Sequence, residues 1–377
     1  MTEIFVSSDN IVSPIGLTTA GNFSQLKNHV TGVKLNDDKG MSDHPFQAAL
    51  FTDDSFYINN STTSYTKFEN LLMASITGAL EGSHISPADK RTVLIISSTK
   101  GNISLLETEA VSAALYKRIS LHTSAQLVAD HFQFVNTPVV VSNACISGML
   151  AILTGMRLIQ SGRYDHAVVA GADIISKFVL SGFQSFQAVS HLPCKPFDAA
   201  RDGINLGEAA GTIILTSNKA LSSGIKAAGG AVSNDANHIS GPSRTGEELY
   251  IAIKKALQAA GIAAHDIGFI SAHGTATVFN DEMEANAIGL AGMQEVPVNS
   301  LKGYYGHTLG AAGLIESVIS FQSLKEELLI PTKGFENSGV SQAVNICSSL
   351  QKTTAQHFLK TASGFGGCNA AMVFSKQ

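Results

Sequence analysis

The segment from Pro138 to Gly148 constrains the fold of this chain most strongly, because it joins an apolar run to a helix pattern within a few residues. Its three valines, residues 139–141, predict a short strand buried on both faces. Small and polar residues end this strand, and residues 149–159 then follow helical spacing. Cys145 is therefore predicted to lie where a buried strand turns into a helix. Because backbone N–H groups are unpaired there and the helix dipole favours an anion, this thiol should ionise more easily than a free one, as a cysteine nucleophile requires.

Buried strands alternate with helical patterns along most of the chain. In the first half, the patterns predict strands at 4–12, 91–98, 167–172 and 210–216, and helical regions at 68–81 and 105–132. In the second half, they predict strands at 225–232, 267–272 and 296–301, and helices at 245–260 and 311–324. Such alternation indicates a parallel or mixed sheet with helices on its faces. Because the spacing of Cys145 and Gly148 recurs in His307 and Gly310, we predict a duplicated α/β unit with a shared cleft and a junction near Ser222.

Charged residues are scarce: they make up 15% of the 377 residues, against roughly 25% in an average globular protein. We therefore expect part of the surface to be buried in a subunit interface. The net charge of −5 and the lack of a basic run argue against nucleic acid as a ligand. The four cysteines have neither zinc spacing nor a CxxC pair, the first residues lack the pattern of a signal peptide, and no apolar run approaches a membrane span. The expectation is a reduced, soluble, cytoplasmic protein.

Three further segments place reactive residues at the ends of predicted buried strands. His273 ends one strand, and in an α/β sheet the carboxyl end of a strand faces the crevice where ligands bind. His307 follows Lys302 by five residues and lies at a predicted helix start. Residues 363–370 form a glycine-rich turn whose backbone could approach a reacting group closely. Each feature alone is more often structural, as a core histidine, a solvated lysine or a tight turn. Their combination with Cys145 indicates one site.

With these segments, the chain resembles the elongating β-ketoacyl-acyl-carrier-protein synthases of the thiolase superfamily. The matching segments stand in the family's order and cover most of the chain from about residue 91 onward: Asn143-Ala144-Cys145, residues 195–203 (KPFDAARDG), residues 207–211 (GEAAG), His273-Gly274-Thr275, Lys302 with Gly306-His307, and residues 364–367 (GFGG). The resemblance implies an α/β, thiolase-like fold in which two similar halves form a layered αβαβα arrangement. Residues 1–221 would carry the nucleophile, and residues 222–377 would carry the histidines.

The resemblance also implies a decarboxylative Claisen condensation, in fatty-acid or polyene/polyketide biosynthesis. Cys145 would take an acyl chain from a carrier-protein thioester, and backbone N–H groups of Cys145 and Phe365 would form the oxyanion hole. His273 and His307 would then stabilise the enolate that forms when a malonyl-carrier thioester loses CO2. Neutral imidazoles that donate hydrogen bonds suit this charge, whereas a carboxylate would repel it.

The same resemblance assigns supporting roles. Lys302, paired with Glu284, would support the two histidines without touching substrate. Thr275 and Thr277 match residues that hydrogen-bond the phosphopantetheine arm, and Phe365 matches the gate of the acyl pocket. No metal and no cofactor are expected, because the substrates are carried on the phosphopantetheine of acyl carrier protein.

The implied partners are acyl carrier protein and a second subunit. The family pairs through the strand before the nucleophile, here residues 139–142, so we expect a homodimer or a heterodimer with a related subunit. Because carrier proteins are acidic, positive charge is expected around the tunnel mouth, and the favoured docking residues are Lys67, Lys195 and Arg201.

Two departures from the family leave the substrate open. Residues 98–101 (STKG) stand where a glycine-rich stretch is usual, and Ser363 stands where many members carry an aromatic residue. Three alternatives also remain. A non-catalytic chain-length factor would keep the fold without the nucleophile, a coenzyme A-dependent thiolase would use a second cysteine such as Cys368, and a plain Cys-His hydrolase would need no malonyl substrate. An initiating synthase uses a Cys-His-Asn set, which His307 opposes.

Overall fold

The computed structural model of this chain describes residues 2–53, 55–57, 65–237 and 241–377. Its main feature is a ten-stranded sheet with the strand order β11-β10-β14-β15-β9-β1-β8-β6-β4-β5. Five of these strands come from each half of the chain. The halves join where β1 (Ile4–Val12) pairs with β9 (Ile225–Asn234) over three residue pairs. The sheet is therefore two five-stranded units connected along one short seam.

Eight of the ten strands of the main sheet lie where the sequence predicts strands, whereas the two strands that flank the glycine-rich turn, at 357–364 and 368–376, are not predicted. The other strands of the first unit are β4 (Thr92–Ser97), β5 (Val139–Val141), β6 (His166–Asp173) and β8 (Ala209–Thr216). Those of the second unit are β10 (Phe269–Ser271), β11 (Val298–Asn299), β14 (His357–Gly364) and β15 (Cys368–Lys376). A separate three-stranded sheet contains β2 (Val33–Asn36), β3 (Phe46–Ala49) and β7 (Leu206–Gly207), while β12 (Leu328–Leu329) pairs with β13 (Gln351–Lys352).

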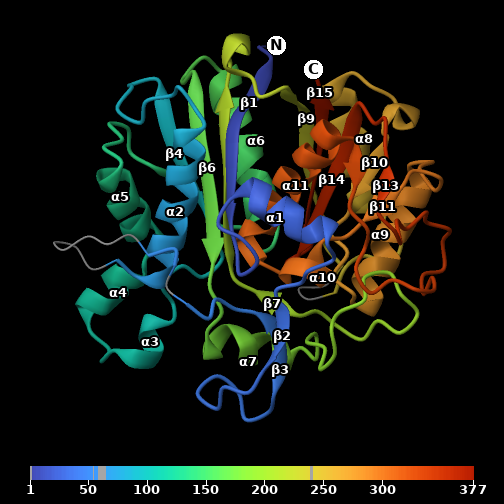
Figure 1. Ribbon diagram of the computed structural model, residues 1–377, viewed down its shortest axis with the longest axis horizontal. Coiled ribbons are helices and arrows are strands. Elements are labelled where there is room, and N and C mark those ends of the chain that lie inside the picture. Colours follow the sequence, from blue (N-terminus) through green and yellow to red (C-terminus); the bar gives the residue numbers. More distant parts are fainter. Residues whose placement is uncertain (1, 54, 58–64, 238–240) are drawn as a thin grey trace.

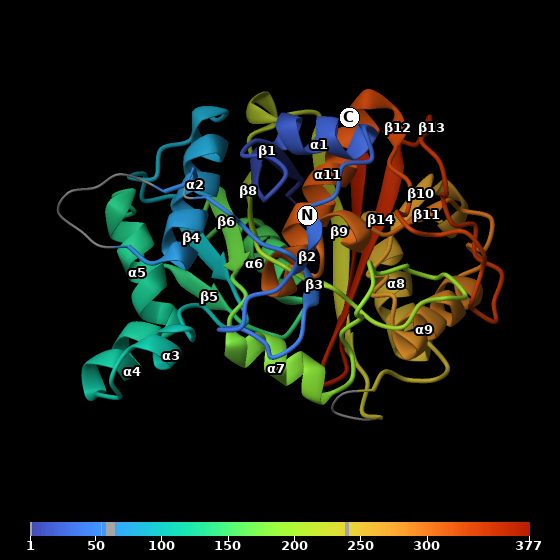
Figure 2. The same ribbon diagram turned by 60° about the horizontal axis from the view of Figure 1, so that its bottom comes forward.

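Helices cover both faces of each unit (Figures 1 and 2). On the outer face of the first unit lie α2 (Lys67–Glu81) and α5 (Leu121–His131), and on that of the second lie α8 (Glu247–Ala260) and α9 (Val278–Leu290). Between the units lie α6 (Ser147–Gln160) and α11 (Ala312–Glu326), each in contact with strands of both. This arrangement confirms the predicted layered αβαβα fold.

The remaining helices are short: α1 (Thr19–Lys27), α3 (Leu105–Thr108), α4 (Ala113–Ile119), α7 (Lys177–Ser185) and α10 (Lys302–Tyr305). The region predicted to be largely helical at 105–132 divides into α3, α4 and α5, because Ser112 and Ser120 adopt extended conformations and each precedes a new helix. Within the described ranges, no helix is long and apolar enough to cross a membrane.

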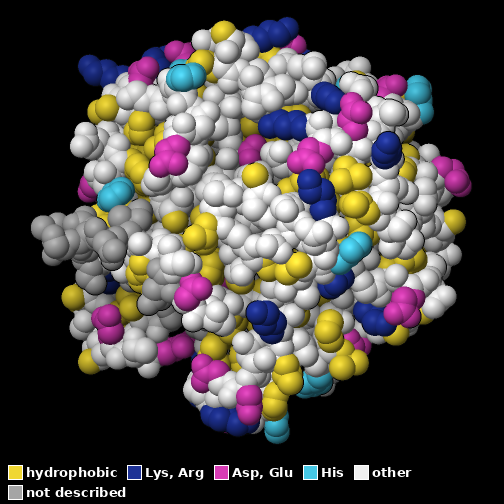
Figure 3. Space-filling view, in the orientation of Figure 1, with side chains coloured by type: hydrophobic (Ala, Val, Ile, Leu, Met, Phe, Trp, Pro, Cys, Tyr) yellow, Lys and Arg dark blue, Asp and Glu magenta, His cyan; other side chains and the backbone are white. Residues whose placement is uncertain are grey.

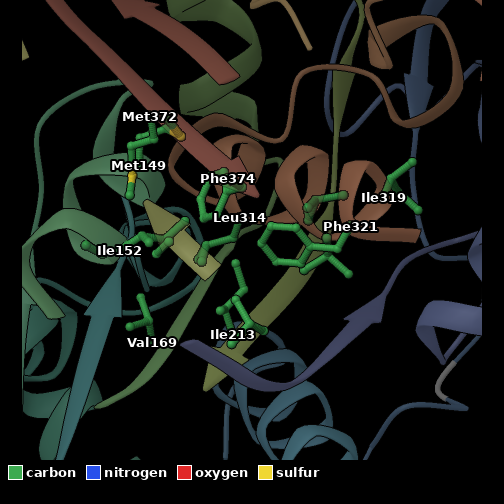
Figure 4. Close-up of a cluster of buried hydrophobic side chains, with 14 of the residues drawn as sticks. Met149, Ile152, Val169, Ile213, Leu314, Ile319, Phe321, Met372 and Phe374 are labelled. Carbon is green, nitrogen blue, oxygen red and sulfur yellow. The ribbon is translucent and has the colours of Figure 1, made fainter. Parts of the chain in front are cut away.

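The largest apolar cluster fills the space between the two units (Figure 4). Helix α11 is buried around most of its circumference, as expected for a helix covered on both sides by sheet. Nine labelled side chains show how α6, α11 and strands of both units interlock: Met149, Ile152, Val169, Ile213, Leu314, Ile319, Phe321, Met372 and Phe374. The two central helices therefore have little freedom to shift against the sheets.

Glycines bring the N-termini of α6 and α11 close together. A Cβ atom on Gly148 would lie 2.9 Å from the carbonyl oxygen of Gly310, and one on Gly313 would lie 2.8 Å from the backbone nitrogen of Met149. Any larger residue at either position would push the helices apart. This close crossing brings the residues that precede the two helices into one place.

Strand β5 differs from its prediction. It lies at the edge of the sheet and pairs only with β4, and Val139 and Val140 are half-buried. The prediction of burial on both faces is therefore wrong for the isolated chain. A run of valines cannot distinguish an edge strand from a central one, since both are apolar when the edge is covered by another element or subunit.

Candidate active site

Cys145 lies in a tight turn between β5 and α6. Ser147 fixes the turn, because its hydroxyl oxygen accepts from the backbone N–H of Asn143 (2.8 Å) and its O–H donates to the carbonyl oxygen of Ala144 (2.6 Å). Ala144 has a φ of 44°, a strained conformation for a residue with a side chain and one that clusters at functional sites. Cys145 is thereby held just before the start of α6, as predicted.

His307 occupies the equivalent place before α11. Its backbone N–H donates to Asn205 (2.7 Å), and its carbonyl oxygen accepts from Gly207 (3.0 Å). Gly306 has a φ of 67°, and a Cβ atom there would collide with the carbonyl oxygen of Leu206, so the turn requires glycine. These contacts fix the backbone from which the imidazole projects.

The structure brings Cys145, His273 and His307 together. The Nε2 atom of His307 lies 3.0 Å from the Sγ atom of Cys145, and the two imidazole rings meet edge to face with centroids 5.3 Å apart. One side-chain atom from each of the three residues lies within 4.8 Å of the others. All three residues line one cavity of about 510 Å³. The cavity can therefore present a thiol and two imidazoles to a single substrate.

Burial dominates the electrostatics of this group. It raises the pKa of the Cys145 thiol to about 12, which contradicts the expectation that the thiol ionises easily. The helix start does not compensate for the loss of water around the sulfur. Burial, together with the nearby Lys302 ammonium, also holds the pKa of His273 and of His307 well below the ordinary value. Both partners of the contact are thus neutral at pH 7.

The predicted pairing of Lys302 with Glu284 is wrong. Lys302 instead donates to Glu316 Oε1 (2.7 Å) on α11 and to the carbonyl oxygen of His273 (2.6 Å), and its Nζ atom lies 3.4 Å from His273 Nδ1. Glu284 accepts from the backbone N–H groups of His273 and Gly274, both at 2.8 Å. The cause is geometric: Glu284 lies on α9, which faces the N–H groups after β10, whereas Glu316 lies on α11, beside Lys302.

Asp281 is a further carboxylate beneath the site, and it belongs to the His273 segment of the sequence without a predicted role. It accepts from the backbone N–H groups of Phe197 (2.7 Å) and Thr275 (2.9 Å), and burial raises its pKa to about 7. The hydroxyl groups of Thr275 and Thr277 lie 2.9 Å apart, and both residues line the cavity. The available signal was an acidic residue in the first turn of a helix after a strand end.

The glycine-rich turn joins β14 to β15 beside Cys145. A Cβ atom on Gly364 would lie 3.0 Å from the backbone nitrogen of Cys145. Gly367 has a φ of 78°, and a Cβ there would collide with Asp235, so only glycine fits. Phe365 is 37% exposed and packs against Phe183 and Phe186, at centroid distances of 5.7 and 5.3 Å. The turn is thus placed as the predicted oxyanion hole and gate require, while those roles stay predictions.

The departure at residues 98–101 has a structural role. Asp173, buried at the end of β6, accepts from Ser98 Oγ (2.7 Å) and from the backbone N–H groups of Thr99 and Lys100. The same carboxylate accepts from the N–H of Gly310 (2.7 Å), three residues after His307. Asp173 therefore ties this segment of the first unit to the turn that carries His307 in the second.

Two of the three favoured docking residues are engaged inside the chain. Lys67 pairs with the buried Glu208 at 2.6 Å, and Arg201 is itself buried and donates to the carbonyl oxygens of Asp198 (2.9 Å) and Gly339 (2.6 Å). Burial contradicts a docking role for Arg201, whereas the side chain of Lys67 stays partly exposed and its docking role stays a prediction. Lys195 stays partly exposed, 3.4 Å from an exposed Glu336. On the face drawn in Figure 3, basic and acidic side chains are interspersed rather than gathered in a patch.

Comparisons with known proteins agree with this geometry. Residues 16–220 match the model of the β-ketoacyl synthase N-terminal domain, and residues 225–336 match that of its C-terminal domain. The chain is 31% identical over 256 residues to 3-oxoacyl-acyl-carrier-protein synthase 2 of Vibrio cholerae. The aligned region covers 63% of this chain and 62% of that protein. It is 34% identical over 253 residues to the protein of the same name from Rhizobium meliloti, with 63% and 60% covered.

Solved structures match over the whole chain. A ketosynthase in complex with its chain length factor, from Xenorhabdus doucetiae, has a TM-score of 0.90 and 25% identity, with 100% of this chain and 98% of that chain covered. A β-ketoacyl synthase from Burkholderia phymatum has a TM-score of 0.91 and 23% identity, with both chains fully covered. The chain therefore belongs to the β-ketoacyl synthase family of condensing acyltransferases and has their thiolase-like fold.

Proposed function

We propose that this protein is a β-ketoacyl synthase that condenses malonyl-carrier thioester with an acyl chain held on Cys145. The observation that carries the proposal is the 3.0 Å contact between Cys145 Sγ and His307 Nε2, with His273 across the same cavity. A nucleophile in contact with a base, and a second imidazole beside both, is the set that two-step acyl transfer needs.

Acylation begins with proton transfer from Cys145 to His307. The sulfur attacks the carbonyl carbon of an acyl-carrier thioester, and the negative charge that develops on its oxygen is stabilised by backbone N–H groups at the α6 start and the Phe365 turn. The bond from carbon to the pantetheine sulfur then breaks, and that sulfur takes the proton from His307. The neutral state of His307, which follows from its lowered pKa, makes the first transfer possible.

Condensation uses both histidines as hydrogen-bond donors. When the malonyl group loses CO2, the electron pair of the broken C–C bond forms an enolate, and its oxygen accepts N–H bonds from His273 and His307. The enolate carbon attacks the acyl carbon on Cys145, the bond to sulfur breaks, and the released thiolate takes up one proton, which restores the neutral thiol. The product is a 3-oxoacyl thioester two carbons longer. Neutral imidazoles suit this step because a charged carboxylate in their place would repel the enolate.

The cavity offers a route for a thioester arm. Thr275 and Thr277 line it and supply hydroxyl groups, and its mouth carries exposed apolar side chains, with Val278 52% exposed and Phe279 68% exposed. These features support substrates delivered on a phosphopantetheine arm, with no cofactor bound by the chain itself. They are equally compatible with a growing fatty-acid chain and a polyene or polyketide chain.

We also propose that the functional form is a dimer that receives acyl carrier protein. The half-buried edge strand β5 and the low content of charged residues support a covered surface beside the nucleophile. The Xenorhabdus relative was solved with a chain length factor, which supports a heterodimer with a related subunit here, and a homodimer is the alternative.

Two alternatives fit the site less well. A non-catalytic chain-length factor has no need of Cys145, His273 and His307 in contact. A thiolase would need a second cysteine in the cavity, but among the described residues Cys145 is the only cysteine that lines it; the Cys368 thiol instead points toward the carbonyl oxygens of Asn143 and Phe365.

The test is condensation by the purified protein, given acyl- and malonyl-carrier thioesters, with coenzyme A thioesters as the comparison. We expect a 3-oxoacyl-carrier product and release of CO2. Product formed only after a related subunit is added would identify a heterodimer, and product formed only from two acyl-coenzyme A molecules would identify a thiolase. Absence of condensation with every carrier substrate and partner would contradict the proposal.

A further inference from the structure

A second lysine, Lys360, lies fully buried behind the active site. It occupies the middle of β14, and its Nζ atom donates to the carbonyl oxygens of Ser271 (3.1 Å), Ala272 (3.1 Å) and Thr361 (2.7 Å). Nζ also lies 2.7 Å from Glu316 Oε2. Because an ammonium group loses a large hydration energy on burial, a lysine in a sheet interior needs such a set of partners.

Lys360 and Lys302 share one carboxylate. Lys302 contacts Oε1 of Glu316 at 2.7 Å, and Lys360 contacts Oε2 at 2.7 Å. Glu316 lies on α11, the helix that begins shortly after His307. The carboxylate therefore connects two ammonium groups to the helix that follows the second histidine.

The two lysines also hold three successive carbonyl groups at the end of β10. Lys360 binds those of Ser271 and Ala272, and Lys302 binds that of His273. On the N–H side, Glu284 holds His273 and Gly274, and Thr361, the neighbour of Lys360, donates its hydroxyl to Glu284 (2.5 Å). The backbone that carries His273 is thus fixed from both sides by buried charges.

We propose that Lys360 is a positioning residue for the condensation. Lys360 holds the end of β10, which precedes His273, and it also contacts Glu316 on α11, the helix that follows His307. It therefore fixes the position of His273 relative to His307. This role rests on the proposed function, because only an enolate-forming reaction needs both imidazoles at one substrate oxygen.

The charge of Lys360 also affects the pKa values of the two histidines. Lys302 and Lys360 oppose Glu316 and Glu284, so the buried cluster holds two positive and two negative groups. Lys360 is one of the charges that lower the pKa of His273 and of His307. Its removal leaves an excess carboxylate near both rings, which raises their pKa values. Among the described residues, the titratable and charged groups that contact the two histidines or the backbone beside them, or that shift their pKa values, are Cys145, Asp173, Asp281, Glu284, Lys302, Glu316 and Lys360.

The experiment compares the pH dependence of CO2 release from malonyl-carrier thioester in the parent and in Lys360→Met. Activity requires neutral imidazoles, so it is lost as pH falls through their pKa values. In Lys360→Met this acid limb of the pH profile should move up by about one pH unit. At pH values on the parent's acid limb, the rate of CO2 release should fall by about ten-fold, and at high pH it should fall by less.

A double variant separates the electrostatic role from simple damage to the fold. Lys360→Met with Glu316→Gln removes one charge of each sign, so the net charge of the cluster is again that of the parent, while Lys302 keeps its contact with the carbonyl oxygen of His273. Its acid limb should return toward that of the parent, and circular dichroism of both variants checks that each one is folded.

The possible failures are distinguishable. A parent that releases no CO2 at any pH would overturn the proposed function and this role with it. An active parent, combined with an unmoved limb in Lys360→Met or with an equal shift in the single and double variants, would overturn the role of Lys360 alone.

Discussion

The turns that carry Cys145 and His307 occupy equivalent places in the two units but are built differently. The first passes directly from β5 into α6 and has no charged residue of its own. The second passes from β11 through α10 and a 3-10 turn into α11. It buries Lys302 at the start of α10 and Glu316 in α11. One unit thus presents a nucleophile on a helix start, and the other presents the imidazoles in front of a buried charge cluster.

The difference teaches how a duplicated fold divides a reaction. Acylation needs a thiol, a proton acceptor and backbone N–H groups, which a short turn supplies. Enolate formation needs imidazoles kept neutral and rigid, for which fixed positive charge behind them is effective. The buried charges, which cost desolvation free energy, lie in the unit that carries the histidines for enolate formation.

Mutating the two turns separately should give the largest effects. Cys145→Ala should abolish acylation and condensation but leave the histidines able to release CO2 from malonyl-carrier thioester. His307→Ala should lower CO2 release by about 10²–10⁴-fold, the usual contribution of a positioned acid or base. Release of labelled CO2 and formation of product measure the two steps. Equal loss of CO2 release in the two variants would mean that the turns do not divide the chemistry.

The charge cluster of the second unit should matter strongly for stability. Lys302→Met leaves Glu316 with one ammonium partner, and breaking a buried pair costs about 3–5 kcal/mol. Lys27→Met is the matched control, since Lys27 pairs with the exposed Glu326 at 2.8 Å and such pairs contribute at most about 1 kcal/mol. Urea unfolding monitored by circular dichroism gives both values. Similar costs for the two variants would show that the cluster is no more important than a surface pair.

The approach of the two turns should be sensitive to one methyl group. Gly148→Ala places a Cβ atom 2.9 Å from Gly310 O, and overpacking of this kind costs about 1–3 kcal/mol. It should also slow acylation, because the shift separates Cys145 from His307. Gly182→Ala in α7 is the control: its Cβ would meet no atom within 4 Å, so it should be neutral or slightly stabilising. Unchanged acylation in Gly148→Ala would contradict the importance of the helix crossing.

The carboxyl group of Asp281 should make the free energy of unfolding depend on pH. The turn that carries Cys145 should make no such contribution. Burial raises the pKa of Asp281 from 3.8 to about 7, so the protonated form is favoured on folding. Its contribution is fully present below the unfolded pKa and is lost as pH rises through about 7. The free energy of unfolding should therefore fall more between pH 5 and pH 8 in the parent than in Asp281→Asn. Parallel pH dependences in urea unfolding would rule out a raised pKa for this carboxyl group.

The smallest effect is expected at the surface, for Lys195. Reversing its charge in Lys195→Glu should raise KM for a carrier-bound substrate by a few-fold and leave turnover of a small pantetheine thioester unchanged, since rim charges mainly affect encounter. Lys67→Glu, in contrast, should impair both substrates, because it breaks the pair with Glu208. An equal effect of Lys195→Glu on both substrates would exclude a docking role.

Local patterns in the sequence predict the alternation of strands and helices, the duplicated unit and the three side chains at the cavity, whereas the layered arrangement follows from the resemblance to the family. Cys145 and His273 each follow a short apolar strand, His307 lies at a predicted helix start, and strand ends meet at one edge of a sheet. Partners within the charge cluster depend instead on which helix lies behind each strand. A local pattern therefore does not indicate Glu316 or Lys360, and the pairing of Lys302 with Glu284 rests on the resemblance alone.

A local sequence pattern also does not predict whether a strand lies at the edge of a sheet or how far a pKa is shifted. The valines of β5 resemble those of a central strand, and only the strand order identifies the edge. The helix start at Cys145 favours a thiolate, but the depth of burial, which the sequence does not specify, decides the pKa. The division of the chain at residues 221 and 222 stays a prediction.

The most direct test of the central claim is to locate the acyl group. The protein is incubated with a mixture of acyl-carrier thioesters, and intact-mass and peptide mass spectrometry then identify the modified residue. We predict a single acyl group on Cys145, absent from Cys145→Ala. Acylation of Cys194, Cys347 or Cys368 in its place, or continued acylation of Cys145→Ala, would contradict the account.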